Sequence, residues 1–229
     1  VTGSIRGSTF QKGYGLTYEG SFLFPNFTND YTTFVRDANY DKVSLFGFVD
    51  CSTDVGDNFT GTSLRKALSD AATLKVYAIR DKEASKNVRF QLESDFHDTS
   101  TDFTLTSDTF FDVYDDEMWN LSVRVKPNKF AAEFITGSDD LSYDVIFSGY
   151  NPKSAGVYDN FKVSTTVTKT VGQSIITRRK RPYVGADRIP TTAAPYGVPG
   201  KPAYRCDVYA GSVSYYLKSI NDDELLQHA

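Results

Sequence analysis

The sequence predicts an all-β fold in which antiparallel strands form a two-sheet sandwich. About a dozen short segments rich in β-branched and aromatic residues alternate with turn residues. Very few segments have the spacing of a helix, whereas a parallel α/β sheet needs a helix between successive strands. Aromatic residues are abundant, with 15 Tyr and 17 Phe in 229 residues, and such side chains fit the half-buried face of a sheet.

A single domain is expected over residues 16–229, preceded by an N-terminal arm or edge strand over residues 1–15, which are rich in Gly, Ser and Thr. β-sandwiches often reach this length as one unit, and the 40% hydrophobic content supplies a sizeable core. Because the sequence begins at Val1 rather than Met, we expect a processed product or part of a longer protein.

In the first half of the chain the expected strands are short and bounded by turns. A strand beginning at residue 21 ends before Pro25, and the almost wholly apolar segment 43–49 suits a strand buried on both faces. One helical segment has apolar residues at helical spacing, at 63–72. Further strands are expected at 31–35, 74–79, 88–92 and 102–114, with 74–79 and 88–92 forming a hairpin.

The clearest strand covers residues 118–125, where apolar and polar residues alternate. This period of two predicts one face toward the core and one face away from it. The core-facing residues are Trp119, Leu121, Val123 and Val125, and the opposite face carries Asn120, Ser122 and Arg124.

The second half of the chain continues the β pattern and ends on a helix. Asn221 can cap that helix, Glu224 follows three residues later, and acidic residues occupy the first turn. Residues 189–202, rich in Pro, Gly and Thr, predict a long surface loop. Strands are expected at 129–135, 142–148, 158–168, 181–186 and 204–217, the last broken at Gly211.

Four local patterns occur in order along the chain, at residues 20–31, 117–123, 183–186 and 212–229. Together they resemble concanavalin A-like jelly rolls, especially the laminin G-like group. The resemblance implies an antiparallel two-sheet jelly-roll sandwich in which Trp119 packs between the sheets. Two departures are a segment from 143 to 181 that is longer than the group requires and a laminin-type calcium site that is not recognisable.

The last two patterns, with the long loop between them, are similar to laminin G-like domains in virion structural proteins, notably those of tailed phages of marine microbes. This resemblance implies a non-enzymatic virion domain that decorates or assembles the particle and contacts other virion chains as a homo-oligomer. Attachment to host-surface glycan is a further role that it implies. The alternatives are a secreted or cell-surface carbohydrate-binding lectin and a polysaccharide hydrolase or lyase.

No catalytic residue is assigned from the sequence. Jelly-roll glucanases carry carboxylates at alternate positions of one strand, and no such run occurs here. Asp115, Asp116 and Glu117 are consecutive, so they cannot all face one way on a strand, and we expect them in a loop. A G-x-S-x-G nucleophile elbow is also missing.

Metal binding has only weak candidates. Asp54 with Asp57, or Asp95 with Asp98, could supply oxygen ligands to calcium, although neither run matches an EF-hand loop. Acidic loops are more often solvated turns. Zinc is not expected because Cys/His clusters are missing, and no other cofactor is implied.

For glycan binding, four tyrosines lie in or beside predicted loops, although tyrosines near strand ends often cover core edges instead. These candidates are Tyr150, Tyr158, Tyr196 and Tyr204. The formal net charge of −4 disfavours nucleic acid as a partner, and no apolar run approaches the roughly 20 residues of a membrane span.

Two further features have open interpretations. The basic run at 178–181 is expected to be a solvated hairpin end or a salt-bridging edge, with contact to nucleic acid or acidic glycan as the alternative. Cys51 and Cys206 are expected to be buried thiols, with a disulfide as the alternative.

Overall fold

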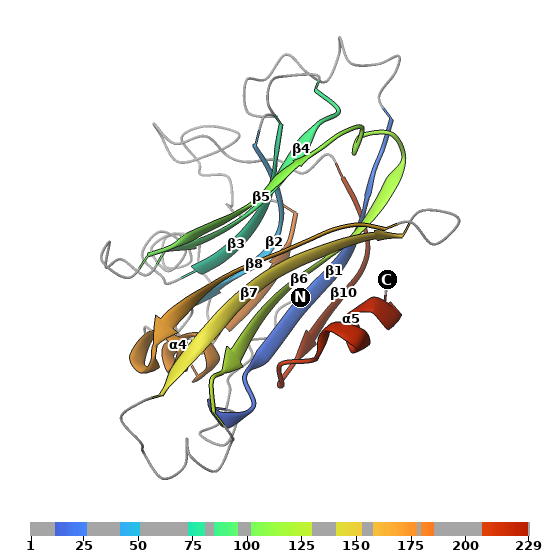
Figure 1. Cartoon of the computed structure of the whole chain (residues 1–229). Coiled ribbons are helices and arrows are strands. Elements are labelled where there is room, and N and C mark those ends of the chain that lie inside the picture. The colour runs from blue at the N-terminus through green and yellow to red at the C-terminus, as the bar shows by residue number, and fades with distance from the viewer. Residues whose placement is uncertain are drawn as a thin grey trace, which may run out of the picture.

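The computed structural model describes residues 12–26, 42–50, 73–80, 85–95, 102–129, 141–152, 158–177, 180–185 and 208–228. Ten strands and two helices lie within these residues (Figure 1). The strands are β1 (Leu16–Phe24), β2 (Lys42–Asp50), β3 (Thr73–Arg80), β4 (Val88–Asp95), β5 (Thr104–Phe110), β6 (Glu117–Pro127), β7 (Ser142–Pro152), β8 (Tyr158–Thr168), β9 (Lys180–Val184) and β10 (Tyr209–Tyr216). The helices are α4 (Lys169–Thr177) and α5 (Asp222–His228).

The described strands form two five-stranded sheets, which pack as a sandwich (Figure 1). The first, here called the β6 sheet after its central strand, has the order β10-β1-β6-β7-β8. The second, the β3 sheet, has the order β5-β4-β3-β2-β9. Every pairing within both sheets is antiparallel, which confirms the predicted fold class.

The core between the sheets is rich in aromatic side chains. Trp119 of β6 is fully buried, and its ring centroid lies 4.7 Å from the rings of Phe90 and of Phe110, which belong to the β3 sheet. Phe90 also stacks on Phe161 of β8 at 5.5 Å. Such contacts add to the stabilisation that comes from removing these large side chains from water.

The alternation predicted for β6 is present, and its outward face is more buried than the pattern suggests. The four apolar residues predicted to face the core are buried. Ser122 and Arg124, which point away from the core, are each only 3% exposed. Arg124 is buried because the C-terminal segment lies over it: its guanidinium donates to the backbone of Ile220 and to Asp222.

Several element predictions hold, with adjusted boundaries. β2 is buried on both faces from residue 43 to residue 48, and β3 and β4 form the expected hairpin. β1 begins at Leu16, earlier than the predicted start at residue 21. Gly211 does not break β10; instead, an extra residue of β10 bulges between the pairs Gly20–Val213 and Phe22–Ala210.

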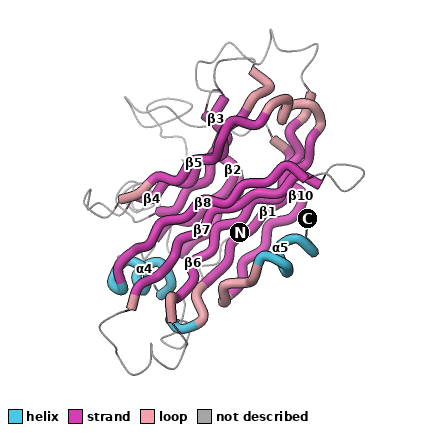
Figure 2. The backbone as a smooth tube through the Cα atoms, viewed as in Figure 1, coloured by secondary structure: helices cyan, strands magenta, loops and turns pink. Residues whose placement is uncertain are grey.

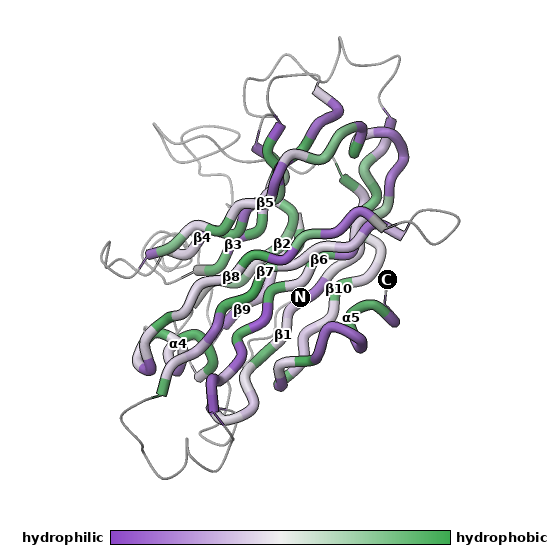
Figure 3. Tube along the Cα trace, in the orientation of Figure 1, coloured by the Kyte–Doolittle hydropathy of each residue, from purple (hydrophilic) through white to green (hydrophobic). Residues whose placement is uncertain are grey.

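The C-terminal helix begins as predicted. The backbone N–H of Glu224 donates to Oδ1 of Asn221 at 2.7 Å, and the backbone N–H of Asn221 donates to Oε2 of Glu224 at 2.9 Å. This reciprocal pair is a capping box. Figure 3 shows that hydrophilic residues occupy most of α5, whose Leu225 is nevertheless buried against the sheet.

Helix α4 is absent from the sequence-based prediction and accounts for part of the long segment from 143 to 181. It contacts β6, β7 and β8 near one end of the β6 sheet (Figure 2). Its Ile175 and Ile176 are buried, and Gly172 lies against the ring of Tyr143. The alternating pattern of β8 continues up to the first residue of α4. Because α4 is short and directly follows this strand, the helical spacing of its apolar residues is easily missed.

The basic run differs from the solvated end predicted for it, at least at Lys180. This side chain is 2% exposed, and its Nζ donates to the backbone carbonyl of Ile176 at 2.8 Å. The predicted strand at 31–35, helix at 63–72 and loop at 189–202 lie outside the described residues, as do Cys51 and Cys206. No helix within the described ranges is long and apolar enough to cross a membrane.

Candidate ligand-binding face

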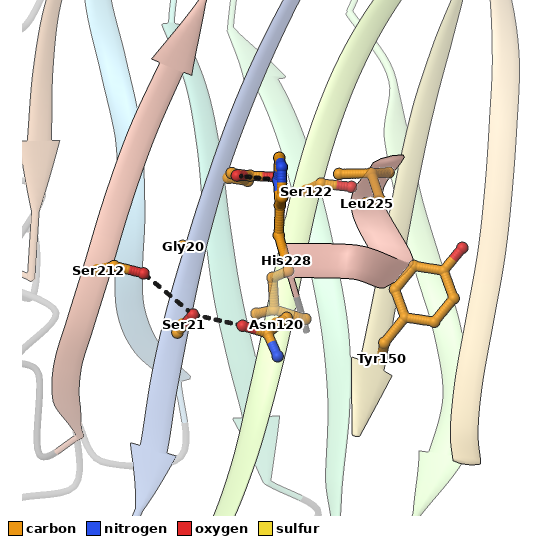
Figure 4. Close-up of a pocket in the computed structure, with 10 residues that line it drawn as sticks. Gly20, Ser21, Asn120, Ser122, Tyr150, Ser212, Leu225 and His228 are labelled. Atoms are coloured by element: carbon orange, nitrogen blue, oxygen red, sulfur yellow. Dashed lines mark hydrogen bonds and ion pairs between the residues drawn. The ribbon is translucent and has the colours of Figure 1, made fainter. Parts of the chain in front are cut away.

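A shallow hollow lies on the outer face of the β6 sheet, the face turned away from the β3 sheet, where α5 crosses the strands (Figure 4). Its volume is about 30 Å³, enough for one or two water molecules. Strands β1, β6, β7 and β10 supply its floor and α5 its wall. The lining residues are Glu19, Gly20, Ser21, Asn120, Leu121, Ser122, Tyr150, Ser212, Leu225 and His228.

Strand register assembles the polar part of this lining. Ser21 of β1 pairs with Asn120 of β6, and Asn120 pairs with Tyr150 of β7. The bulge in β10 brings Ser212 beside Ser21, with 3.2 Å between the two hydroxyl oxygens. These four residues, here called the polar row, cross four strands in a line because residues at paired positions share one face of a sheet.

Hydrogen bonds give the polar row a direction. The hydroxyl of Ser21 donates to Oδ1 of Asn120. A serine hydroxyl carries one proton, so in the contact between Ser212 and Ser21 the donor is Ser212. The chain therefore runs from Ser212 through Ser21 to Asn120, and the Nδ2 group of Asn120 lies on the side away from Ser21 (Figure 4).

An acidic group borders the hollow under the C-terminal end of α5. Oε1 of Glu19 lies 2.8 Å from Nδ1 of His228 and accepts a hydrogen bond of 3.0 Å from the hydroxyl of Tyr216. The His228 ring also stacks on the Tyr216 ring, with 5.8 Å between centroids and 20° between planes. These contacts attach the last turn of α5 to β1 and β10.

A second set of contacts attaches the first turn of α5. Asp222 accepts from Arg124 at 2.5 Å and from Lys162 at 2.7 Å. The hydrogen bond from Lys162, supported by Arg124, holds the pKa of Asp222 below its ordinary value of 3.8, although partial burial opposes this shift. Beneath the helix, the hydroxyls of Ser122 and Ser148 lie 2.8 Å apart in a buried pair.

Tyr150 keeps its proton at neutral pH. Burial, followed by the nearby carboxylate of Asp222, raises the pKa of its phenol above the ordinary value of 10.0. The hydroxyl is therefore available as a hydrogen-bond donor as well as an acceptor.

Of the four tyrosines proposed for glycan binding, the structure places Tyr150 in the lining of the hollow. Tyr158 begins β8, but its side chain is outside the described part of the structure, and Tyr196 and Tyr204 lie outside the described residues altogether. Ser21, Ser212, Glu19 and His228 were not singled out from the sequence. The polar positions of the 118–125 strand are a usable signal for two lining residues, Asn120 and Ser122.

The calcium candidates fall almost wholly outside the described residues. Asp54, Asp57 and Asp98 lie outside the described residues, and Asp95 ends β4 with a side chain that is likewise outside them. Within the described ranges, no three His, Cys, Asp or Glu residues gather as a metal site.

Two of the three consecutive acids, Asp115 and Asp116, lie at the turn before β6 as predicted, whereas Glu117 is the first residue of the strand. Asp115 is exposed and accepts from Lys86 and from Asn26, each at 2.6 Å. Asp116 has a φ of 62°, a left-handed conformation that Asp tolerates in turns. Glu117 already belongs to β6 and accepts a hydrogen bond from Asn151.

No protein-family model matches the sequence, and no curated protein matches it. Among solved structures, the fold is similar to part of tailspike protein 2 from the Escherichia coli O157:H7 bacteriophage CAB120, with a TM-score of 0.50 and 11% sequence identity. The match covers 97% of this chain and 22% of the tailspike chain. At this identity the likeness concerns the fold alone.

Proposed function

We propose that this chain is a non-enzymatic structural domain of a virus particle, a jelly roll of the laminin G-like type. It decorates or assembles the particle next to other virion chains, including copies of itself. The outer face of the β6 sheet contributes to attachment to host-surface glycan.

The observation that carries this proposal is the fold likeness to a phage tailspike, which extends over 97% of this chain. A sandwich that corresponds to about a fifth of a long virion protein is suited to act as one module of a larger chain. The four laminin G-like sequence patterns support the jelly-roll part of the proposal, and the last two of them, with the loop between them, support the virion part. Fold likeness alone does not transfer function, so the particle itself has to be tested.

The composition of the hollow supports a binding role rather than hydrolysis. Glycoside hydrolysis uses two carboxylates on either side of the scissile bond. Among the described residues that line the hollow, Glu19 is the single carboxylate, and it is engaged by His228 and Tyr216. The remaining lining is mainly hydroxyl, amide and phenol groups, which suit recognition of sugar hydroxyls.

The direct test is mass spectrometry of purified particles from the source virus. We expect peptides of the parent protein at a stoichiometry typical of a structural component. Peptides absent from particles, together with a secreted protein in which Cys51 and Cys206 form a disulfide, would instead support the cell-surface lectin.

A second test addresses catalysis. The purified domain is incubated with algal and bacterial polysaccharides, and reducing ends and unsaturated products are measured, with calcium and then with chelator. We expect neither product. Turnover in either assay would identify a hydrolase or a lyase and contradict the non-enzymatic assignment.

A further inference from the structure

We infer that the hollow beside α5 receives one hydroxyl or hydroxymethyl group of a neutral hexopyranose, while the polar row and the strand residues beside it hold the ring of that sugar. This inference rests on the proposed attachment function and deepens it, because it names the class of glycan and the residues that select it.

The size of the hollow sets how a ligand can enter. A space of about 30 Å³ holds one or two water molecules, so a whole sugar ring cannot enter it. A single hydroxyl or hydroxymethyl group does fit, replacing water that such a polar site would hold. The ring of the sugar would then rest on the surface of the strands.

The hydrogen-bond chain of the polar row suits a ligand that both donates and accepts. Ser212 donates to Ser21, which leaves the lone pairs of its own oxygen as acceptors at one end of the row. At the other end, Tyr150 carries a phenolic proton and Asn120 carries an amide group. Neighbouring hydroxyls of a sugar offer both roles within one small ring, whereas an anion offers acceptors only.

The charge of the lining favours a neutral ligand. Glu19 is 14% exposed, and the net charge of it and His228 together is zero or one negative, depending on the protonation of the imidazole. Near the other end of α5, the two cations Arg124 and Lys162 both contact Asp222, and Asp223 supplies a second negative charge close to Tyr150. A carboxylate on the ligand would therefore meet Glu19 without a matching positive charge.

An apolar strip lies next to the polar row on the same face. Leu23 of β1 is paired with Met118 of β6 on one side and with Tyr209 of β10 on the other. Met118 is 39% exposed and Tyr209 is 66% exposed. A pyranose has hydroxyl edges and C–H faces, so it can place its hydroxyls on the polar row and a C–H face on this strip.

Such a shallow contact predicts weak binding by one domain. A few neutral hydrogen bonds and a small apolar contact correspond to a dissociation constant on the order of millimolar. Several copies on one particle would raise the overall avidity by roughly 10²–10⁴. Weak single sites are consistent with an attachment module that acts in many copies.

The experiment is an NMR titration of the isotope-labelled chain with matched pairs of methyl glycosides. The pairs are glucose with glucuronic acid, galactose with galacturonic acid and mannose with mannuronic acid; each pair differs only by a carboxylate in place of the hydroxymethyl group. We expect at least one neutral glycoside to shift the backbone amide signals of Gly20, Leu121 and Tyr150. Its uronic acid partner should bind at least ~10-fold more weakly.

Variants assign the binding to the polar row. Asn120→Ala and Ser212→Ala should each weaken binding by ~5–10-fold, the effect of one lost hydrogen bond. The matched control is Ser164→Ala, an exposed serine on the outer face of β8 away from the hollow, which should leave binding unchanged. Ser212 lies exposed on β10, so its truncation is not expected to disturb folding. The dispersion of the amide signals in the spectrum of each variant checks that the variant is folded.

Three results would overturn the inference: no shift with any neutral glycoside, equal or tighter binding of the uronic acids, or shifts that persist in both row variants. Presence of the chain in particles combined with any of these would reject the glycan site and keep the virion assignment. Neutral glycoside binding by a protein that is absent from particles would reject the virion assignment and keep the glycan site.

Discussion

The guanidinium of Arg124 and the carboxylate of Asp222 lie 2.5 Å apart and join the centre of the β6 sheet to the first turn of α5. Arg124 is buried, whereas the Asp222 side chain is 47% exposed, so the ion pair joins a buried side chain to one that solvent reaches. Asp222 also accepts from Lys162, which places one carboxylate between β6 and β8. This relationship positions the helix that forms the wall of the hollow.

Asp222→Asn should destabilise the fold by about 1–2 kcal/mol, because it leaves the buried guanidinium of Arg124 with a weaker partner. The expected loss is kept at this size because the carboxylate is partly exposed to solvent. Asp223→Asn is the matched control, since it removes the same charge from the same helical turn at an exposed position. Urea denaturation at neutral pH measures both. Equal effects of the two substitutions would mean that helix charge, rather than the Arg124 contact, matters.

The same carboxylate should make stability sensitive to acid. The pKa of Asp222 is lowered in the folded chain relative to its ordinary value of 3.8, so its contribution is present above that value and is lost as the pH falls through the lower folded pKa. The stability gap between the wild type and Asp222→Asn should therefore close below about pH 4. A constant gap down to about pH 2 would contradict the linkage.

A buried tyrosine, Tyr18, and a partly buried one, Tyr215, provide a matched comparison. The hydroxyl of Tyr18 donates to the backbone carbonyl of Tyr183 at 3.0 Å, whereas the buried hydroxyl of Tyr215 has no hydrogen-bond partner among the described residues. Tyr18→Phe should therefore cost about 1 kcal/mol, and Tyr215→Phe should be neutral or stabilising. Thermal denaturation distinguishes the two, and a larger loss for Tyr215→Phe would contradict this assignment of partners.

Alkaline pH should weaken the fold through the phenols of Tyr215 and Tyr143, which are shielded from water. Burial raises the pKa of Tyr215 to about 12, and that of Tyr143 to about 12, from the ordinary 10.0. Stability from a raised pKa is complete below the unfolded value and is lost as the pH rises through the folded value, here from about 10 to about 12. Tyr215→Phe should reduce the slope of stability against pH in that window, as followed by urea denaturation.

Gly172→Ala should destabilise the chain although alanine favours helices. A Cβ at this position of α4 would overlap the ring of Tyr143 and its Cβ, which a change of ring rotamer cannot relieve. Overpacking of this kind costs about 1–3 kcal/mol and outweighs a helix-propensity gain of about 1 kcal/mol. Ser174→Ala in the same helix is the control and should be neutral or slightly stabilising. Stabilisation by both substitutions would contradict the close contact between α4 and Tyr143.

The capping box of α5 should stabilise the helix and, with it, the wall of the hollow. Asn221→Ala should cost about 1 kcal/mol through loss of the cap and should loosen the wall of the hollow. Exposed Gln227→Ala, in the same helix, is the control. Hydrogen exchange of the α5 amides, which should quicken in the first variant only, measures the effect.

The sequence determined the features that depend on local pattern. The alternation around Trp119 predicts which side chains of β6 face the core, and Asn221 with Glu224 predicts where α5 begins, because both follow from residue spacing alone. Helix α4 was missed although Thr168 caps it by accepting a hydrogen bond of 3.4 Å from the backbone N–H of Val171, because this threonine also ends the alternating pattern of β8.

The tertiary structure alone decided which outward-facing residues meet. Ser21, Asn120 and Ser212 come from parts of the chain that are far apart, and strand order, register and the β10 bulge bring them into one line. The burial of Arg124 likewise depends on α5 folding back over β6. A period of two indicates that a side chain points outward, but only the packing of distant elements determines whether it meets water, a helix or a ligand.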